Sequence, residues 1–250
     1  MRSLARIVAL LVCACVLCCS RAKASDEVVV FAAASTTDAM QAIASEWKAQ
    51  GGGDVRFSFG PSSDLSRQIE AGARVDLFLS ADVAKVDALV GKGLVRPGDR
   101  RDLLSNQLVV VVPGASRRSI EQASDLASLD RVALADPDAV PAGIYAKSWL
   151  IREGAWERVS RVVVPTLDVR AALAAVEAET VDAAIVYRTD ALVSKRVRIA
   201  LTVSRDRGAP IVYPLARTSS STNALAGDFF LFLSSPTARA TFERFGFVVL

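Results

Sequence analysis

Short apolar runs rich in β-branched residues alternate along this chain with longer segments of helical periodicity. The run at residues 28–31 precedes a helical pattern over 36–50, and the run at 55–59 precedes another over 63–71. Such alternation is typical of α/β folds, in which helices cover the faces of mainly parallel sheets. Further strands are predicted at residues 76–79, 108–112, 132–135, 162–164, 183–187 and 211–215. The sequence therefore predicts an α/β chain that is long enough to form two lobes.

The first 24 residues have the composition of a secretory signal peptide. Two arginines precede an apolar stretch over 7–19, which is too short to span a membrane as a helix. Ala-Lys-Ala at 22–24 supplies the small residues that a signal peptidase requires, so we expect the mature chain to begin at Ser25. Lipidation at Cys15 or Cys19 is the less favoured alternative, because neither cysteine lies in a well-matched lipoprotein sequence. The sequence thus predicts export to the periplasm.

Cysteine, histidine and charge content narrow the possible functions. All four cysteines, at positions 13, 15, 18 and 19, lie within the expected signal peptide, so the mature chain would have neither a disulfide nor a thiolate metal site. The sequence contains no histidine, the usual general base and the commonest metal ligand. The net charge of +3 falls to −1 because four of the 30 basic residues and none of the 27 acidic ones lie within residues 1–24. We therefore expect no nucleic-acid partner.

Two serines each end an apolar run and open a helical pattern. Ser35 follows Phe-Ala-Ala-Ala at 31–34, and Ser62 follows Phe-Gly-Pro at 59–61. A helix start leaves backbone N–H groups unpaired and carries partial positive charge, and a serine adds a hydroxyl donor there. Two such starts facing one cleft can bind a small oxyanion. Serine is also a preferred N-cap residue, and each serine alone is more typical of a cap than of a ligand.

Three later segments also combine a strand with a helix start or a polar end. Pro141 stands in a position typical of the first turn of a helix. Asp-Val-Arg at 168–170 opens another helical pattern, in which a solvated or locally paired role for the two charges is favoured over ligand contact. The apolar strand at 183–187 ends in Tyr187, whose hydroxyl can face a cleft while its ring packs in the core.

Together and in this order, these segments resemble the ModA family, the periplasmic molybdate-binding proteins of ABC transporters. The resemblance covers nearly all of the mature chain. It rests on VVVFAAAS at 28–35, RQIEAG at 67–72, DLFLSAD at 76–82, PAGIYAK at 141–147 and FERFGF at 242–247. The resemblance implies a two-lobed periplasmic-binding-protein fold of type II-like architecture, with the ligand cleft between the lobes. Lobe 1 would comprise residues 25–105 plus 213–250, and lobe 2 would comprise residues 106–212.

The resemblance also implies which residues hold the oxyanion. Ser35, Ser62 and Tyr187 would bind it through their hydroxyl groups. Ala142 and Val169 would bind it through their backbone N–H groups. The metal would be held only through the oxygens of the oxyanion and not by direct coordination, and no cofactor is implied.

One position of the binding loop departs from the family pattern. Where the family usually has a serine, this chain has Pro61, which has no N–H group to donate. Any backbone donor at that position is lost, and the following Ser63 is a candidate to compensate for it.

The function implied is that of a monomeric receptor that delivers molybdate, and tungstate as well, to the membrane permease of an ABC importer. Sulfate remains an alternative ligand, because the three oxyanions share charge and shape and differ mainly in size. Phosphate is less favoured, since it usually carries a proton at neutral pH and the motifs place no carboxylate to accept it.

A short motif offers an enzymatic alternative. Ser-Glu-Trp-Lys at 45–48 matches the Ser-x-x-Lys pattern of serine acyl-transferases and hydrolases, in which the lysine activates the serine. The accompanying Ser-Asp-Asn and Lys-Thr-Gly motifs are absent from the sequence, and Ser45 lies within a predicted helix. The sequence therefore favours a binding protein over an enzyme.

Overall fold

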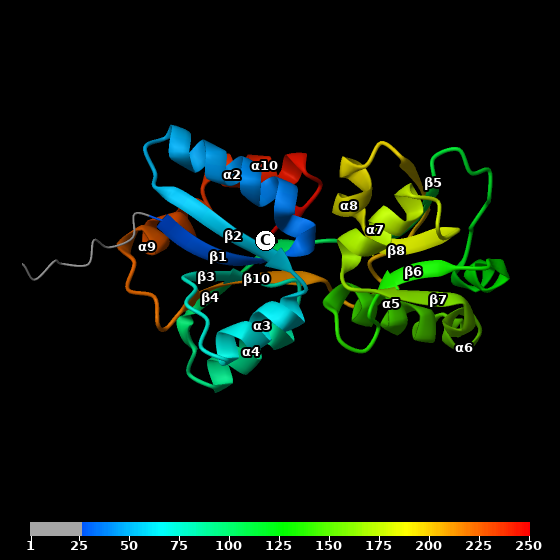
Figure 1. Cartoon of the computed structure of the whole chain (residues 1–250), viewed down its shortest axis with the longest axis horizontal. Helices are drawn as coiled ribbons and strands as arrows, with labels where there is room; N and C mark the ends of the chain where they lie inside the picture. The colour runs from blue at the N-terminus through cyan, green and yellow to red at the C-terminus, as the bar shows by residue number, and fades with distance from the viewer. Residues whose placement is uncertain (1–26) are drawn as a thin grey trace, which may run out of the picture.

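Two separate sheets organise this chain. The computed structural model describes residues 27–250, and the predicted signal peptide over residues 1–24, with both candidate lipidation sites, lies outside them. Within the described range the sheets form two lobes side by side (Figure 1). We name the lobe with the six-stranded sheet lobe 1 and the lobe with the five-stranded sheet lobe 2. The predicted two-lobed α/β architecture is confirmed.

The sheet of lobe 1 combines strands from the two ends of the described chain. In spatial order they are β11 (Val248–Val249), β4 (Val95–Ser105), β10 (Val212–Thr218), β3 (Leu77–Leu79), β1 (Glu27–Ala33) and β2 (Asp54–Gly60). The helices are η1 (Ala34–Thr36), α2 (Thr37–Ala49), α3 (Ser62–Glu70), α4 (Val83–Gly91), α9 (Ala224–Phe232) and α10 (Pro236–Arg244). Helices α2 and α10 lie over one face of this sheet, and α3 and α4 lie over the other (Figure 1).

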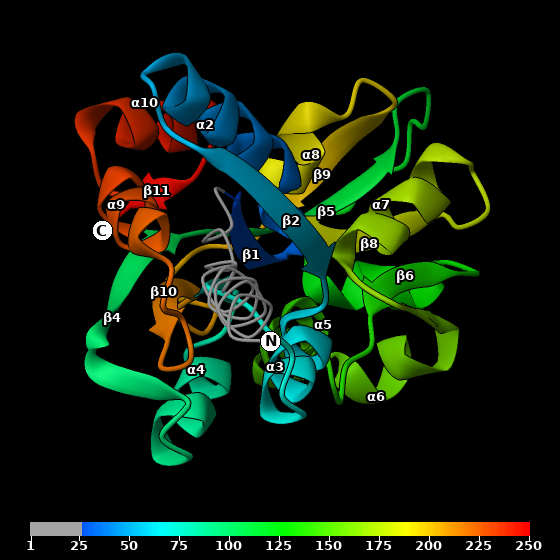
Figure 2. The same cartoon turned by 60° about the vertical axis from the view of Figure 1, so that its left-hand side comes forward.

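The sheet of lobe 2 is built from the middle of the chain. In spatial order its strands are β7 (Val163–Thr166), β6 (Val132–Ala135), β8 (Ala183–Tyr187), β5 (Leu108–Pro113) and β9 (Val197–Thr202). The helices are η2 (Ala123–Ser128), α5 (Pro141–Arg152), α6 (Trp156–Val159), η3 (Ser160–Val162), α7 (Val169–Glu177) and α8 (Arg188–Val193). The turned view shows α2, α10 and α8 on one side of the two sheets and α3, α4, α5 and α6 on the other (Figure 2).

Both sheets are mixed, so the prediction of mainly parallel sheets is wrong. Strand β1 pairs in parallel with β2 and β3, and β6 pairs in parallel with β7 and β8. All pairs of β4, β5, β9, β10 and β11 are antiparallel. Strand β4 continues almost directly into β5, and β9 leads into β10 without a helix, so these strands carry the chain between the lobes. Only strands joined by a crossover helix are constrained to run parallel.

The eight predicted strands are all present, with small shifts at their ends, and three further strands were not predicted. Strand β4 contains Pro97, Gly98 and four arginines or aspartates in succession, which hide its strand character. Strand β9 lies at a sheet edge with half-buried or exposed side chains, and β11 has two residues. These strands depend on their neighbours in the sheet rather than on a local pattern.

The core of lobe 2 is centred on β5, whose sequence is nearly continuous in valine. Val109, Val110, Val111 and Val112 are fully buried between β8 and β9 and the covering helices. Burial of each such side chain contributes about 1.5–3 kcal/mol, so this strand anchors the sheet that positions β6, β7 and β8. Within residues 27–250, none of the helices is long and apolar enough to cross a membrane.

Candidate functional site

The carboxyl ends of the parallel strands in both lobes meet at one small cavity. Its lining follows β1, β2 and β3 in lobe 1 and β6, β7 and β8 in lobe 2. The lining residues are Ala33, Ala34, Ser35, Gly60, Pro61, Ser62, Ala81, Val140, Pro141, Ala142, Asp168, Val169 and Tyr187. All five residues predicted to hold an oxyanion are among them. Ligand sites commonly lie outside the carboxyl ends of parallel strands, because the helices that follow begin there.

Ser35 lies in η1, the single 3₁₀ turn between β1 and α2. Its side chain is almost fully buried, and its Oγ lies 2.9 Å from the hydroxyl oxygen of Tyr213. The capping alternative does not apply to this serine, since neither η1 nor α2 has a side-chain cap from it. Ser35 is therefore held by a tertiary contact that leaves it at the surface of the cavity.

Ser62 is the first residue of α3, and the extended backbone of Pro61 precedes it. The backbone N–H of Ala81 donates to Ser62 Oγ at 2.9 Å, so the hydroxyl hydrogen of Ser62 is available to another acceptor. Pro61 lines the cavity without an N–H group to offer. Ser63 Oγ is buried without a hydrogen-bond partner among the described residues, but Ser63 does not line the cavity.

Ala142 and Val169 lie in the first turns of two helices of lobe 2. Ala142 is the second residue of α5 and Val169 the first residue of α7, where backbone N–H groups have no intrahelical acceptor. The start of α5 is packed tightly on β6: a Cβ added to Gly143 would lie 2.1 Å from the carbonyl oxygen of Ala135. The Pro-Ala-Gly sequence thus fixes where the free N–H groups of this helix point.

Tyr187 ends β8 and is 1% exposed. Its hydroxyl oxygen is buried and has no hydrogen-bond partner among residues 27–250. Burial raises the pKa of Tyr187 well above its usual value, so the phenol stays protonated. A buried hydroxyl without a partner is unfavourable unless a ligand or water accepts its hydrogen. Tyr187 is among the residues that line the cavity, and its hydroxyl without a partner gives the strongest indication of a bound acceptor there.

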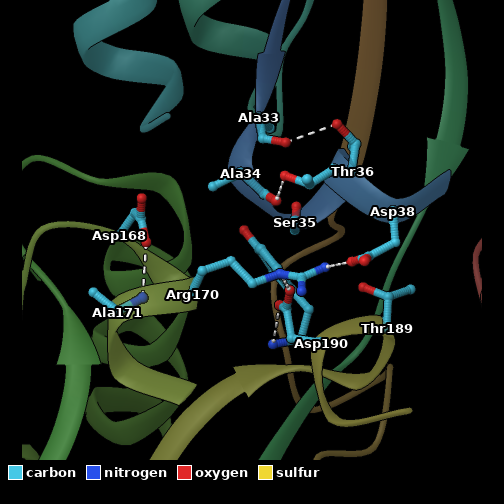
Figure 3. Close-up of polar contacts among 12 residues, drawn as sticks. Ala33, Ala34, Ser35, Thr36, Asp38, Asp168, Arg170, Ala171, Thr189 and Asp190 are labelled. Atoms are coloured by element: carbon cyan, nitrogen blue, oxygen red, sulfur yellow. Dashed lines mark hydrogen bonds and ion pairs between the residues drawn. The ribbon is translucent and has the colours of Figure 1, made fainter. Parts of the chain in front are cut away.

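Arg170 links the two lobes beside the cavity (Figure 3). Its Nη2 donates to Asp38 Oδ2 of α2 at 2.6 Å, and its Nε lies 2.7 Å from Asp190 Oδ1 of α8. Asp190 is fully buried, and that burial raises its pKa to about 7 although Arg170 acts in the opposite direction. Asp168 accepts a hydrogen bond from the backbone N–H of Ala171 and so caps α7. Of the two charges for which a solvated or locally paired role was favoured, Asp168 is paired locally, whereas Arg170 pairs with Asp38, 132 positions away, and with Asp190.

The electrostatics of the cavity come from dipoles and hydroxyls. No lysine or arginine of the described chain is among the lining residues, and Asp168 is the one acidic residue among them. Four helix starts converge there, those of η1 with α2, of α3, of α5 and of α7. Partial positive charge at helix starts favours an anion, so this arrangement is suited to a small anion held by neutral donors.

The enzymatic alternative has no support in the structure. Ser45 lies in α2 with its hydroxyl donating to the carbonyl oxygen of Gln41 at 3.0 Å. Lys48 Nζ lies 2.5 Å from Asp54 Oδ1, and its side chain is 67% exposed. The lysine is thus a solvated partner of Asp54 and does not activate Ser45.

Sequence reasoning missed the residues that support the predicted donors. Tyr213 and Asn106, both buried, lie behind Ser35, and Asp38 and Asp190 hold Arg170. They come from strand ends and helix starts far apart in the chain, and none lies in a motif of its own. A single signal was available for Tyr213, a tyrosine inside the predicted strand at 211–215.

Comparison with known proteins agrees with this geometry. The family model described as a bacterial extracellular solute-binding protein matches residues 28–248. The chain belongs to this family. It is 44% identical over 229 residues to the molybdate-binding protein ModA of Escherichia coli (strain K12), with 89% of each chain covered. It is 36% identical to the ModA protein of Haemophilus influenzae (strain Rd), with 90% of this chain and 91% of that one covered.

Solved structures of solute-binding proteins share the fold. The periplasmic molybdate-binding protein of Azotobacter vinelandii superposes with a TM-score of 0.82 at 22% identity, covering 89% of this chain and 99% of that one. The sulfate-binding protein SubI of Mycobacterium tuberculosis superposes with a TM-score of 0.77 at 20% identity, with coverages of 88% and 86%. The resemblance to the ModA family predicted from the sequence is confirmed by the relatives, which are solute-binding proteins and not enzymes.

Proposed function

We propose that this chain captures molybdate, and tungstate as well, and delivers the oxyanion to the membrane permease of an ABC importer. The observation that carries the proposal is the buried, unpartnered hydroxyl of Tyr187 in a cavity where four helix starts converge. The 44% and 36% identical relatives named as molybdate-binding proteins support molybdate as the ligand.

Five residues would hold the oxyanion. Ser35, Ser62 and Tyr187 would donate hydrogen bonds from their hydroxyls, and Ala142 and Val169 from their backbone N–H groups. Hydrogen bonds to a charged acceptor contribute about 1.5–3 kcal/mol each, so five of them can bind a dianion without a cation. The metal atom of the oxyanion would contact no protein atom, because the oxygens that surround it face the donors.

The two-lobed architecture suggests how the anion is enclosed. We assign residues 25–105 and 213–250 to lobe 1 and residues 106–212 to lobe 2, in keeping with the strands that each sheet contains. Two of the proposed donors then belong to lobe 1 and three to lobe 2. Closure of the lobes about the segments that join β4 to β5 and β9 to β10 would complete the site, as in other hinged receptors.

The cellular setting belongs to the same proposal. Membership of an extracellular family accords with export by the expected signal peptide to the periplasm. We propose that the mature chain acts as a monomer, since one chain supplies all five donors.

Calorimetric titration of residues 25–250 with molybdate, tungstate, sulfate and phosphate in one buffer tests the function. We expect one-to-one binding of molybdate and tungstate that is much tighter than binding of sulfate. Equally tight sulfate binding would instead indicate a general oxyanion receptor, and the fold shared with a sulfate-binding protein makes sulfate the natural comparison. Binding of none of the four anions would contradict the proposal.

A further inference from the structure

A chain of buried hydrogen bonds leads from the junction of the lobes to Ser35. Asn106 lies between β4 and β5, and its Nδ2 donates to Thr189 Oγ1 at 2.9 Å and to Tyr213 Oη at 3.2 Å. Tyr213 Oη lies 2.9 Å from Ser35 Oγ. Asn106, Thr189, Tyr213 and Ser35 are all at most 4% exposed, so water does not compete for these bonds.

The orientation of the Asn106 amide follows from its neighbour. The backbone N–H of Gln107 donates to Asn106 Oδ1 at 2.9 Å, a bond that only the oxygen of the amide can accept. The NH₂ group of Asn106 must therefore face Tyr213, and the Tyr213 hydroxyl accepts a hydrogen bond from it.

The direction of the next bond is set by counting hydrogens. Tyr213 is fully buried, and burial raises the pKa of its phenol, so it retains its one hydrogen. Either oxygen of the Tyr213–Ser35 pair could donate, but Ser35 Oγ is the one acceptor found beside the Tyr213 hydroxyl among the described residues, so we direct that hydrogen to Ser35 Oγ. Ser35 thus accepts from Tyr213, and its own hydroxyl hydrogen is left to point into the cavity.

The hydroxyl of Ser62 is also left with its hydrogen free for a ligand. Its Oγ accepts from the backbone N–H of Ala81, which can only donate. Both serines of lobe 1 therefore have an acceptor position filled by the protein and a hydrogen free for a ligand. Tyr213 donates a hydrogen bond to Ser35, as the backbone N–H of Ala81 donates one to Ser62.

We propose that Tyr213 is a positioning and specificity residue that, together with Asn106, sets Ser35 as a hydrogen-bond donor toward the anion. The inference rests on the proposed oxyanion function. An anion oxygen that carries a hydrogen needs an acceptor, whereas Ser35 oriented in this way presents its hydrogen to the anion and has one of its two lone pairs already filled by Tyr213. Tyr213 therefore shifts the preference toward fully deprotonated oxyanions such as molybdate and sulfate and away from hydrogen phosphate. Tyr187, whose ring centroid lies 6.0 Å from that of Tyr213, remains the one proposed hydroxyl donor with no acceptor bond filled within the described chain.

The test compares sulfate with hydrogen phosphate, two tetrahedral anions that differ in bound hydrogen. Dissociation constants for both are measured by competition against molybdate at mildly alkaline pH, in the wild type and in Tyr213→Phe. We expect the preference for sulfate over hydrogen phosphate to fall about fivefold in the variant, the fold-change of one net hydrogen bond. Ser45→Ala, which removes an exposed hydroxyl of α2 outside the cavity lining, is the control and should leave the preference unchanged.

A double-mutant cycle distinguishes positioning of Ser35 by Tyr213 from a general loosening of the binding site. If Tyr213 acts through Ser35, then Tyr213→Phe should not alter the preference further in a Ser35→Ala protein. Equal weakening of all anions by Tyr213→Phe, or an undiminished effect without Ser35, would overturn the proposal. Should Tyr213→Phe fail to fold, as judged by circular dichroism, Asn106→Leu breaks the chain one bond earlier and should shift the preference in the same direction. A wild type that binds no oxyanion would instead refute the proposed function itself.

Discussion

The proposed hydrogen-bond donors differ between the two lobes. In lobe 1 they are the hydroxyls of Ser35 and Ser62, and each has a further hydrogen bond, with Tyr213 or from the N–H of Ala81. In lobe 2 most of the proposed donors are backbone N–H groups at the starts of α5 and α7, and Tyr187 is the one proposed side-chain donor. The side-chain donors depend on individual neighbours, whereas the backbone donors depend on where a whole helix begins. The lobes should therefore respond to different kinds of substitution.

The largest effect should come from displacing a helix start in lobe 2. In Gly143→Ala the new Cβ would lie 2.1 Å from the carbonyl oxygen of Ala135 and 2.3 Å from that of Asp136. The start of α5 must then move, and we expect about a 100-fold loss of molybdate affinity and a loss of stability of about 1–3 kcal/mol. Titration calorimetry and thermal melting measure the two. Gly91→Ala, at the end of α4 where a Cβ meets nothing within 4 Å, is the control and should leave affinity unchanged.

Removal of one backbone donor should have the next largest effect. Val169→Pro deletes the N–H at the first position of α7, where proline is tolerated, and the preceding Asp168 is already extended. We expect weaker molybdate binding by about 1.5–3 kcal/mol with the helix retained. Val169→Ala keeps the N–H and is the matched control. Equal affinities of the two variants would argue against a backbone donor here.

The serines of lobe 1 should affect both affinity and stability. Ser35→Ala and Ser62→Ala should each weaken molybdate binding by about 1–3 kcal/mol, because the anion loses a donor. Each variant also leaves a buried donor without its acceptor, the Tyr213 hydroxyl in Ser35→Ala and the N–H of Ala81 in Ser62→Ala, so both should lower the melting temperature. Unchanged affinity in both variants would refute the assignment of lobe 1.

The ion pair between the lobes should contribute less. Asp38→Asn removes the charge that Arg170 meets in lobe 1 and keeps its contact with the buried Asp190. The side chains of Arg170 and Asp38 are 26% and 40% exposed, so we expect only a few-fold loss of affinity, smaller still at high salt. Titrations at two salt concentrations measure this. A loss as large as that of Ser35→Ala would mean that the pair acts on the anion more directly.

The last prediction concerns stability rather than binding. Burial raises the pKa of Asp190 to about 7, whereas an unfolded aspartate titrates near about 3.9. Between these values the folded state holds a proton that the unfolded state has lost, so the stabilisation is present at low pH and declines as pH rises toward 7. Melting temperatures of the wild type should fall over this range relative to those of Asp190→Asn. Parallel pH profiles would contradict the raised pKa.

The sequence motifs predicted the proposed donors, and the structure brings these residues together. The residues that hold the donors in place, such as Tyr213, were not predictable from the sequence. Ser35, Ser62, Ala142 and Val169 follow strand ends whose apolar runs are visible in the sequence, and strands that alternate with helices direct their carboxyl ends to one place. Tyr213 contacts Ser35 across 178 positions of sequence, and no local pattern encodes such a contact.

The strand directions show the same limit. The predicted parallel pairing is found between consecutive strands that a helix joins and that pair with each other, as β1 with β2 and β6 with β7, because a helical crossover favours it. It was wrong for β10 and β5, whose neighbours are set by how the chain passes between the lobes. Strand β4 escaped notice because its charged residues and Pro97 have no apolar period.

The chemistry of the proposed donors has a consequence for where such a receptor can work. Serine hydroxyls, peptide N–H groups and a tyrosine whose pKa is raised by burial neither gain nor lose a proton between mildly acidic and mildly alkaline pH. An exported receptor operates at the acidity of its surroundings, not at that of the cytoplasm. The proposed donors would therefore keep one protonation state in both acidic and alkaline surroundings, until the anion itself took up a proton.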